Sequence, residues 1–143
     1  MAKNLTQIAL VDDHTLLRNG LASIVQSFDG YSVMFEADNG KDFIEQLKKY
    51  DTPDIVLLDI NMPEMDGYET AQKIRELEKS QNLAHTPIVA MTAHAMQGDR
   101  ELCLAAGMDG YISKPVDTGK LKNMLEQVIQ SGTDAHCILE QAD

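Results

Sequence analysis

Four short apolar runs in this sequence end next to a charged or hydroxyl side chain. Runs that are apolar without alternation are typical of strands buried on both faces. In an open parallel sheet, ligands bind beyond the carboxyl ends of such strands. The candidates for chemistry are therefore Asp12 and Asp13 after "IALV" (8–11), Asp59 after "IVLL" (55–58), Thr92 after "IVAM" (88–91) and Lys114 after "GYIS" (110–113).

The three carboxylates favour a metal ion. At an effective dielectric constant of about 20 they would repel one another by roughly several kcal/mol, so they must bind protons or a cation. Their oxygen atoms, without sulfur or histidine, suit a hard divalent ion, and a site with room for water suits Mg²⁺ better than Ca²⁺. One Mg²⁺ and the ammonium group of Lys114 would balance the charges of Asp12, Asp13 and Asp59, and the site could then accept an anion.

A phosphoryl group fits such a site, because its transfer needs an in-line nucleophile and cations on the equatorial oxygens more than acid or base chemistry. Asp59 could attack phosphorus to form an acyl phosphate, while Mg²⁺, Lys114 and the Thr92 hydroxyl hold the oxygens. Each of these residues alone is more often a turn former, a helix cap or a surface residue. Their shared position at the ends of four strands is what indicates a function.

Five units of strand and helix must position these residues. A further apolar run, "YSVMF" (31–35), is present, and helical periodicity follows every run. The alternation predicts a doubly wound α/β fold, a five-stranded parallel sheet in the order 2-1-3-4-5 within a flavodoxin-like (βα)5 three-layer sandwich. We expect Thr15 and Asp117 to cap helices. The expected core faces of the helices are Leu17, Leu21, Ile24 and Phe28; Phe43, Ile44 and Leu47; Ala71, Ile74 and Leu77; Met96, Leu102 and Ala106; and Leu121, Met124, Leu125, Val128 and Ile129.

Length and composition limit the class of protein. A chain of 143 residues, 43% hydrophobic and without Trp, suits a single aliphatic core, which we expect over residues 1–131 with a flexible tail over 132–143. The formal net charge of −11 would repel nucleic acid and anionic membranes, so we expect neither as a partner. Cys103 and Cys137 form no CxxC pair, which favours reduced thiols. Because there is no apolar run of about 18 residues, we expect a soluble, cytoplasmic protein.

The segments "ALVDDH", "DIVLLDINMPEMDG", "PIVAMTA" and "GYISKP" occur in this order. Together they resemble the CheY-like receiver domain of two-component response regulators, over roughly residues 5–130. The resemblance implies a phosphoacceptor, a set of Mg²⁺ ligands and a switch. The implied residues are Asp59 as phosphoacceptor; Asp12, Asp13, Asp59 and the backbone carbonyl of Asn61 as Mg²⁺ ligands; Thr92 and Lys114 as contacts of the phosphoryl group; and Thr92, Tyr111 and Pro115, the last after a cis bond, as the switch.

The resemblance also implies partners. A histidine kinase or a histidine phosphotransfer protein would donate the phosphoryl group in a phosphorelay. Thr92 would then move inward and Tyr111 would turn into the space left, so that the face built by the fourth helix, fifth strand and fifth helix binds a downstream protein. The chain would be a monomer or a phosphorylation-dependent dimer. It would not be an enzyme in the turnover sense, because it assists only its own phosphorylation and dephosphorylation.

Three alternatives are open at this point. "VDDHTLLRNGLASIV" resembles receivers joined to helix-turn-helix outputs, whereas "TAHAMQGDRELCLAAGMDGYISKP" resembles receivers of hybrid histidine kinases. The chain is therefore either a stand-alone receiver, which we expect, or a module excised from one of these. A phosphatase with an aspartyl intermediate is disfavoured, because Asn61 stands where such enzymes commonly carry an acid. The third alternative is a receiver-like binding module that never cycles phosphate.

The four histidines, His14, His85, His94 and His136, form no pair at metal-binding spacing. We therefore expect them at the surface or at helix ends, outside the set of metal ligands. His94, two residues after Thr92, would lie near the mouth of the site and could modulate phosphate lifetime.

Overall fold

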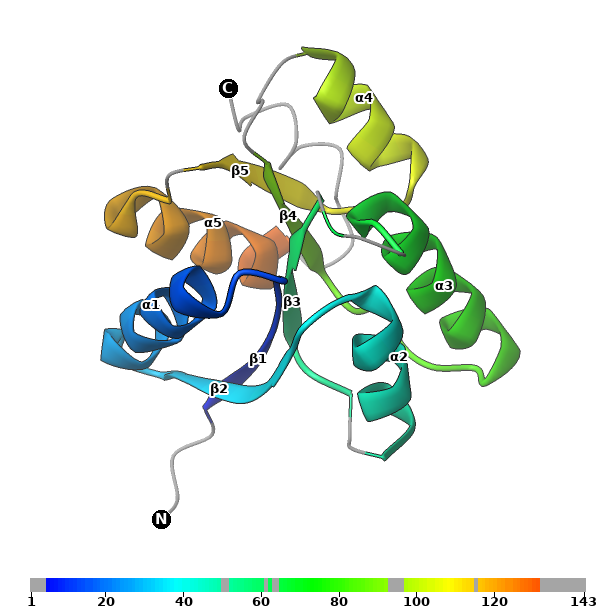
Figure 1. Cartoon of the computed structure of the whole chain (residues 1–143), viewed down its shortest axis with the longest axis horizontal. Helices are drawn as coiled ribbons and strands as arrows, with labels where there is room; N and C mark the ends of the chain where they lie inside the picture. The colour runs from blue at the N-terminus through cyan, green and yellow to red at the C-terminus, as the bar shows by residue number, and fades with distance from the viewer. Residues whose placement is uncertain are drawn as a thin grey trace.

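Strands and helices alternate along the chain in the computed structural model of the protein (Figure 1). The structure describes residues 5–49, 52–60, 62, 65–92, 97–114 and 116–131, leaving aside the side chains of residues 97–100, 130 and 131. Every predicted strand is present. The strands are β1 (Thr6–Val11), β2 (Tyr31–Ala37), β3 (Ile55–Asp59), β4 (Ile88–Thr92) and β5 (Gly110–Ser113). The helices are α1 (Thr15–Ser27), α2 (Gly40–Lys49), α3 (Gly67–Ser80), α4 (Gln97–Ala105) and α5 (Thr118–Ser131).

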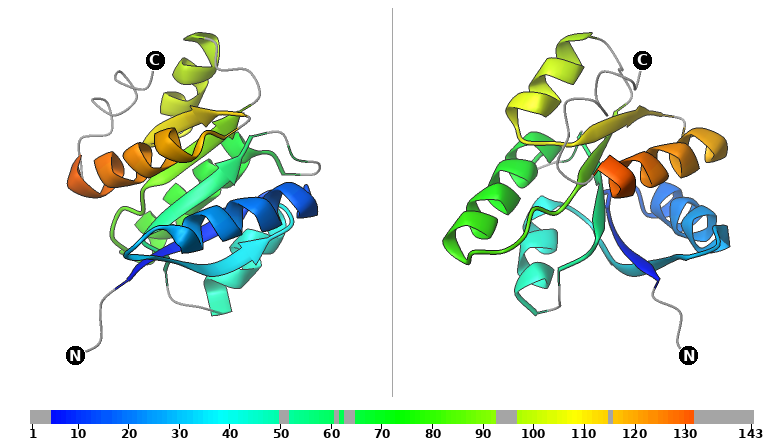
Figure 2. Two further views of the ribbon diagram at one scale, coloured as in Figure 1. Left: turned by 90° about the vertical axis from the view of Figure 1, so that its left-hand side faces the viewer. Right: turned by 180° about the vertical axis from the view of Figure 1, so that it is seen from behind.

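The strands form one parallel sheet in the order β2-β1-β3-β4-β5. This order and the doubly wound α/β fold confirm the prediction. Helices α1 and α5 cover one face of the sheet, and α2, α3 and α4 lie on the other side (Figures 1 and 2). The prediction succeeds because unbroken apolar strands must be covered on both faces, which helices between parallel strands can do.

Successive residues of a strand point to opposite faces of the sheet, so each central strand contributes to two cores. In β3, Ile55 and Leu57 belong to the apolar cluster that α1 and α5 complete, whereas Val56 and Leu58 belong to the cluster that α2, α3 and α4 complete. All four residues are at most 1% exposed. Packing on both sides therefore holds β3, and with it the position of Asp59 at its end.

Among the described residues that the periodicity assigns to the core, three are exposed instead, and the predicted core residue Met96 lies outside the described residues. The exposed fraction is 58% for Leu17, 53% for Leu102 and 46% for Ile129. Leu17 belongs to the first turn of α1, which starts beyond the end of β1, so the sheet covers the helix only from Leu21 onward. In α4 the buried side chain is that of the neighbouring Cys103.

The helix caps agree with the sequence in one case of two. Asp117 caps α5, since its Oδ2 accepts a hydrogen bond from the amide of Lys120 at 3.0 Å. Thr15, predicted as a cap, is the first residue of α1, and His14 holds the cap position. Across the described residues, no helix is both long enough and apolar enough to span a membrane.

The register of the strands decides which side chains meet at the carboxyl edge of the sheet. Val11 of β1 pairs with Leu58 of β3, so the residues that follow them, Asp12 and Asp59, stand level on adjacent strands. The same register continues through β4 to the end of β5. The candidate site is built at this edge.

Candidate functional site

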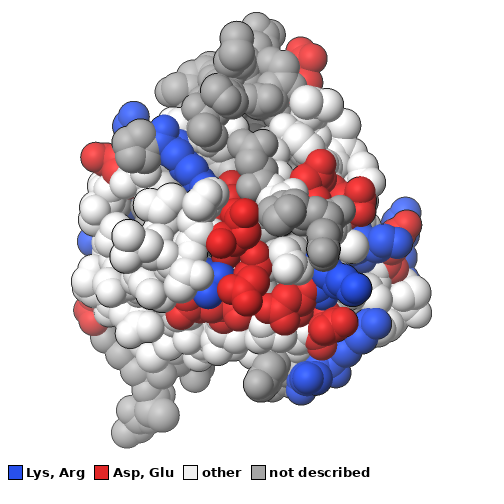
Figure 3. All heavy atoms as spheres, viewed as in Figure 1, with Lys and Arg blue, Asp and Glu red and all other residues white. Residues whose placement is uncertain are grey.

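An acidic cluster occupies the carboxyl edge of the sheet. One carboxylate oxygen from each of Asp12, Asp13 and Asp59 and one ring nitrogen of His14 all lie within 4.8 Å of one another. The side chains of Asp12 and Asp59 are each 2% exposed, and that of Asp13 is 28% exposed. Figure 3 shows Asp and Glu side chains gathered across the middle of the face that Figure 1 presents. Because carboxylates at such short range repel one another, the cluster favours a bound cation.

Lys114 reaches the acidic cluster from the end of β5. Its Nζ lies 3.0 Å from Oδ1 of Asp59 and 3.4 Å from Oδ2 of Asp12. The backbone amide of Lys114 donates to the carbonyl of Thr92 at 2.7 Å, which ties this residue to the end of β4. One ammonium group does not neutralise three carboxylates, so the pocket keeps enough negative charge for a divalent ion.

The ligand set of the acidic cluster fits Mg²⁺. The carboxylates of Asp12, Asp13 and Asp59 supply hard oxygen atoms, and the partial exposure of Asp13 leaves a side open for water, which Mg²⁺ retains. The remaining predicted ligand, the carbonyl of Asn61, lies outside the described residues. So do the predicted switch residue Pro115 and His94.

The backbone at Ile60 and at Gly67 is held close to the end of β3. Ile60 donates its amide to the carbonyl of Met91 at 3.1 Å, and Gly67 donates its amide to the carbonyl of Ile60 at 2.9 Å. A Cβ atom on Gly67 would lie 2.7 Å from the carbonyl oxygen of Asp59 and 2.7 Å from Cα of Ile60. Only glycine permits this approach, so the start of α3 packs directly on the backbone of Asp59.

Arg18 of α1 holds β1 and the end of β2 together beside the acidic cluster. Its Nη1 donates to the carbonyl of Asp12 at 2.6 Å and pairs with Asp38 at 2.8 Å, and its Nε pairs with Glu36 at 3.0 Å. Burial acts to lower the pKa of Arg18, but the hydrogen bonds to Asp38 and Glu36 outweigh it and raise the pKa above its usual value. The guanidinium therefore stays charged. Sequence spacing did not single out this residue, because its partners lie on another strand.

Thr92 and Tyr111, two of the predicted switch residues, are both buried, with 3% and 5% exposed. Thr92 is the last residue of β4, and Tyr111 of β5 pairs with Ala90 of β4. Tyr111 belongs to the apolar cluster on the side of α2, α3 and α4. Both side chains are therefore inside the protein, and the turn of Tyr111 toward Thr92 on phosphorylation stays a prediction.

His14 lies closer to the acidic cluster than its classification as a surface histidine implies. Its Nδ1 is 3.1 Å from Oδ1 of Asp13 and 3.3 Å from Oδ1 of Asp12, although 59% of its side chain is exposed. The expectation of a helix-end histidine is correct, since His14 caps α1. What the sequence analysis missed is the turn of the ring toward the carboxylates. The available signal was its place directly after two aspartates at a strand end.

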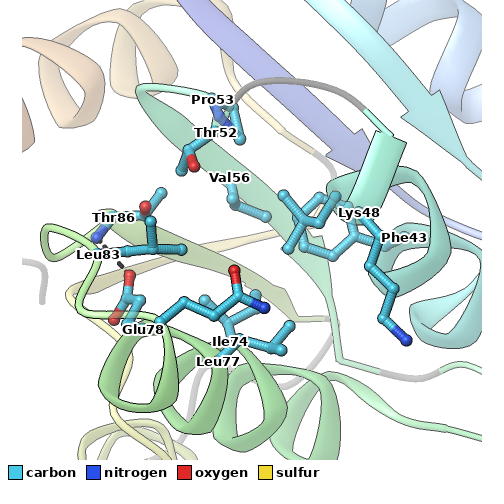
Figure 4. A pocket seen from close by; sticks show the side chains of 12 residues that line it. Phe43, Lys48, Thr52, Pro53, Val56, Ile74, Leu77, Glu78, Leu83 and Thr86 are labelled. Carbon is cyan, nitrogen blue, oxygen red and sulfur yellow. Dashed lines mark hydrogen bonds between the residues drawn. The ribbon is translucent and has the colours of Figure 1, made fainter.

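A small cavity lies between α2, α3 and β3 (Figure 4). Its walls include Phe43, Val56, Ile74 and Leu77, with the carboxylate of Glu78 nearby. Its volume of about 50 Å³ exceeds the roughly 10–15 Å³ that a single water molecule needs. None of the predicted site residues lines this cavity, so the candidate site is the acidic cluster.

A parallel sheet in this strand order, with an acidic cluster and a lysine at its carboxyl edge, defines the class of CheY-like receivers. The family model described as the response regulator receiver domain matches residues 8–126, so the chain belongs to that family. As a receiver domain, it has a phosphoacceptor role in two-component signalling. This confirms the family that the motifs indicated.

Similar receivers occur within histidine kinases. The sensor histidine kinase RcsC of Salmonella typhi is 42% identical to this chain over 118 residues, which are 82% of the chain and 12% of the kinase. The hybrid signal transduction histidine kinase L of Dictyostelium discoideum is 33% identical over 136 residues, which are 92% of the chain and 8% of the kinase. The chain therefore spans only a small part of the length of these relatives.

Solved structures of separate receivers are similar as well. Chemotaxis protein CheY4 of Vibrio cholerae has a TM-score of 0.77 and 26% identity, and the match covers 87% of this chain and 98% of CheY4. The CheX-CheY-BeF3-Mg²⁺ complex of Borrelia burgdorferi has a TM-score of 0.77 and 28% identity, and the match covers 86% of this chain and 88% of the matched chain. These neighbours support the same fold and family.

Proposed function

We propose that Asp59 accepts a phosphoryl group from a phosphohistidine donor and that the phosphorylated chain then binds a different protein. The observation that carries this proposal is the position of Lys114, whose Nζ lies 3.0 Å from Oδ1 of Asp59 beside a cluster of acidic ligand atoms. A carboxylate nucleophile next to an ammonium group and a site for a divalent ion is the arrangement that phosphoryl transfer requires.

In the proposed step, a carboxylate oxygen of Asp59 attacks phosphorus while the phosphorus–nitrogen bond of the donor breaks, and the imidazole leaves with the bonding electrons. Mg²⁺, when bound to Asp12, Asp13 and Asp59, supplies positive charge to the phosphoryl oxygens. Lys114 contributes a second positive charge, and the Thr92 hydroxyl donates a hydrogen bond. The complex of the similar Borrelia burgdorferi CheY with BeF3 and Mg²⁺ supports this choice of metal.

The donor is proposed to bind over the first turns of α1. Leu16 and Leu17 are 84% and 58% exposed, and with Val116 they line an apolar groove. Lys114 lines the same groove and also contacts Asp59, so the groove adjoins the acidic cluster. A histidine kinase or phosphotransfer protein with an apolar helix surface beside its phosphohistidine would cover these leucines and bring the donor imidazole to Asp59.

The downstream partner is proposed to bind the face formed by α4, β5 and α5. Leu102 on α4 is 53% exposed, and Tyr111 of β5 is buried behind this face. Phosphorylation would increase the population of an arrangement in which Thr92 contacts the phosphoryl group and Tyr111 turns toward it. The chain would act as a monomer or as a phosphorylation-dependent dimer. It would modify only its own Asp59 and turn over no external phosphoester.

The test is phosphorylation with Mg²⁺ and acetyl phosphate, followed by electrophoresis in a gel that retards phosphoproteins. Wild type is expected to give a retarded band, and Asp59→Asn is expected to give none. Asp54→Asn is the matched control, because Asp54 precedes the opposite end of the same strand, where its Oδ2 accepts from the amide of Gln7 at 2.8 Å. A retarded band retained in Asp59→Asn would refute the assignment.

Partner binding is tested by pull-down with and without beryllofluoride. A protein captured only in the presence of beryllofluoride supports the switch. Loss of that capture in Leu102→Ser, with phosphorylation unchanged, supports the proposed output face. Steady release of phosphate from an excess of a small phosphoester would instead support the phosphatase alternative.

A further inference from the structure

We propose that His14 is an additional metal ligand of the acidic cluster and that it gives the site a preference for divalent ions that bind nitrogen, such as Co²⁺, over Mg²⁺. This inference rests on the proposed function, because it concerns the same metal site. It goes beyond that function by naming a ligand outside the carboxylates and a metal class that this ligand selects.

The first support is the distance between the possible ligand atoms. Nδ1 of His14 lies 3.1 Å from Oδ1 of Asp13 and 3.3 Å from Oδ1 of Asp12. Adjacent ligands of an octahedral ion with bonds of about 2.1 Å are about 3.0 Å apart, and opposite ligands are about 4.2 Å apart. The ligand atoms of Asp12, Asp13, His14 and Asp59 all lie within 4.8 Å of one another, so movements below about 1 Å would place them around one ion.

The second support is the way the backbone holds His14. The residue holds the N-cap position of α1 without a hydrogen bond from its side chain to the helix, and its amide donates to Oδ1 of Asp12 at 2.9 Å. This bond ties the histidine to the carboxylate whose other oxygen, Oδ2, lies 3.4 Å from Nζ of Lys114. The backbone of His14 is therefore fixed beside the acidic cluster, so the ordering that ion binding requires is confined to the ring.

The third support is ligand chemistry. Imidazole nitrogen suits Zn²⁺, Cu²⁺, Ni²⁺ and Fe²⁺, and the affinity of a mixed nitrogen and oxygen site rises from Mn²⁺ to Co²⁺ along the first transition row. Mg²⁺ prefers oxygen and keeps its waters. If His14 only forms an ion pair with the aspartates, removing it should change the affinity for each of these metals by a similar factor. If it is a ligand, the loss should be largest for Co²⁺, smaller for Mn²⁺ and smallest for Mg²⁺.

The experiment measures metal binding directly on the full chain. The background carries His136→Gln and Cys137→Ser, because the segment "DAHC" (134–137) offers an imidazole and a thiol that would also bind Co²⁺. Co²⁺ binding is followed by visible absorption, Mn²⁺ binding by the electron paramagnetic resonance signal of the free ion, and Mg²⁺ binding by competition with Mn²⁺. His14→Gln is compared with His85→Gln, since His85 is another histidine paired with an aspartate, with Nε2 2.6 Å from Oδ1 of Asp109.

We expect His14→Gln to lower the Co²⁺ affinity about tenfold or more, a loss of the size seen when a supporting contact of a metal site is removed. The affinity for Mg²⁺ should change by less than about twofold, and His85→Gln should leave both ions unaffected. Zn²⁺ should also shift the ring ¹⁵N resonances of His14 in wild type. Thermal melting shows whether each variant is folded. If His14→Gln is unfolded, His14→Asn takes its place in the comparison.

Equal changes in the affinities for Co²⁺, Mn²⁺ and Mg²⁺ in the His14 variant would overturn the inference, as would unshifted ring resonances with Zn²⁺ bound. These outcomes leave the proposed function intact, provided that Asp59→Asn weakens the binding of all three ions. Failure of wild type to bind any of these ions would overturn the metal site itself, and with it both proposals.

Discussion

Replacement of Gly67 by alanine should destabilise the protein and slow the phosphorylation of Asp59. Glycine at this position lets the first turn of α3 pack against the end of β3. An added Cβ would lie 2.7 Å from the carbonyl oxygen of Asp59, 2.7 Å from Cα of Ile60 and 3.2 Å from the carbonyl carbon of Asp59. Two of these contacts are with the backbone of Asp59, the proposed phosphoacceptor, so relief of the clash must move either α3 or Asp59.

The size of the effect follows from these distances. Carbon atoms attract most strongly at about 3.5–4.0 Å, so the two segments must separate by about 1 Å. Overpacking of this kind costs about 1–3 kcal/mol. The better helix propensity of alanine offsets up to about 1 kcal/mol in a helix interior, and less at the first residue of α3, where Gly67 stands. The expected net loss is about 1–2 kcal/mol, or a decrease in Tm of roughly 2–8 °C for a domain of this size.

Gly20→Ala is the matched control. Gly20 lies in the interior of α1, and a Cβ added there would meet nothing within 4 Å. The same substitution should therefore stabilise the protein by about 0.5–1 kcal/mol, because alanine restricts the unfolded chain more than glycine does. Both variants replace glycine by alanine in a helix, so they differ only in the atoms that surround the added methyl group.

The assay is urea unfolding followed by circular dichroism, together with the rate of phosphorylation by acetyl phosphate in Mg²⁺ well below the melting temperature. We expect Gly67→Ala to unfold at lower urea and to phosphorylate more slowly, and Gly20→Ala to unfold at higher urea with an unchanged rate. Wild-type stability and rate in Gly67→Ala would refute the close packing of α3 on Asp59. Equal shifts in both variants would show that helix propensity governs the result.

Three further substitutions test other contacts. Arg75→Met should cost about 3 kcal/mol in urea unfolding, because Nη2 of Arg75 lies 2.8 Å from Oδ2 of Asp109, whose side chain is 4% exposed; a loss below about 1 kcal/mol would contradict the importance of this pair. Asp66→Ala should cost about 1 kcal/mol, since Oδ1 of Asp66 caps α3 by accepting a hydrogen bond from the amide of Glu69 at 2.9 Å, and Asp66→Asn, which retains an acceptor, should cost less. Burial raises the pKa of Tyr31 above its usual value of 10.0. Above about pH 10 the unfolded state therefore loses the phenol proton while the folded state keeps it, and the free energy of unfolding falls as the pH rises. Tyr31→Phe should lose less stability than wild type as the pH rises from about 9 to about 11, and equal losses would refute this.

The sequence by itself determined the five strands and the residues at their carboxyl ends, and the common order of doubly wound folds placed those ends at one edge. Unbroken apolar runs and the polar residues that end them are local signals, so they locate strand ends without any knowledge of packing. The topology then brings distant residues together, as with Lys114 and Asp12, which pair although they are 102 residues apart. The prediction worked because both residues stand at strand ends, so the backbone brings them to the same edge of the sheet.

The sequence predicted the buried faces of the helices only in part. The periodicity shows which side of a helix is apolar, but it does not show how far the sheet extends beneath that side. Leu21 is buried, whereas Leu17, one turn earlier on the same face, is 58% exposed because α1 starts beyond β1. The exposed leucines at the start of α1 are the ones that we propose to bind the donor.

Only the tertiary structure decided which side chains surround the carboxylates. Arg18 reaches Glu36 and Asp38, 18 and 20 residues away, and its guanidinium also holds the backbone of Asp12. The ring of His14 turns toward Asp12 and Asp13, although its neighbours in sequence would equally allow it to face solvent. Long and rotatable side chains choose among partners according to the packing and charge around them, and these exist only once the chain has folded.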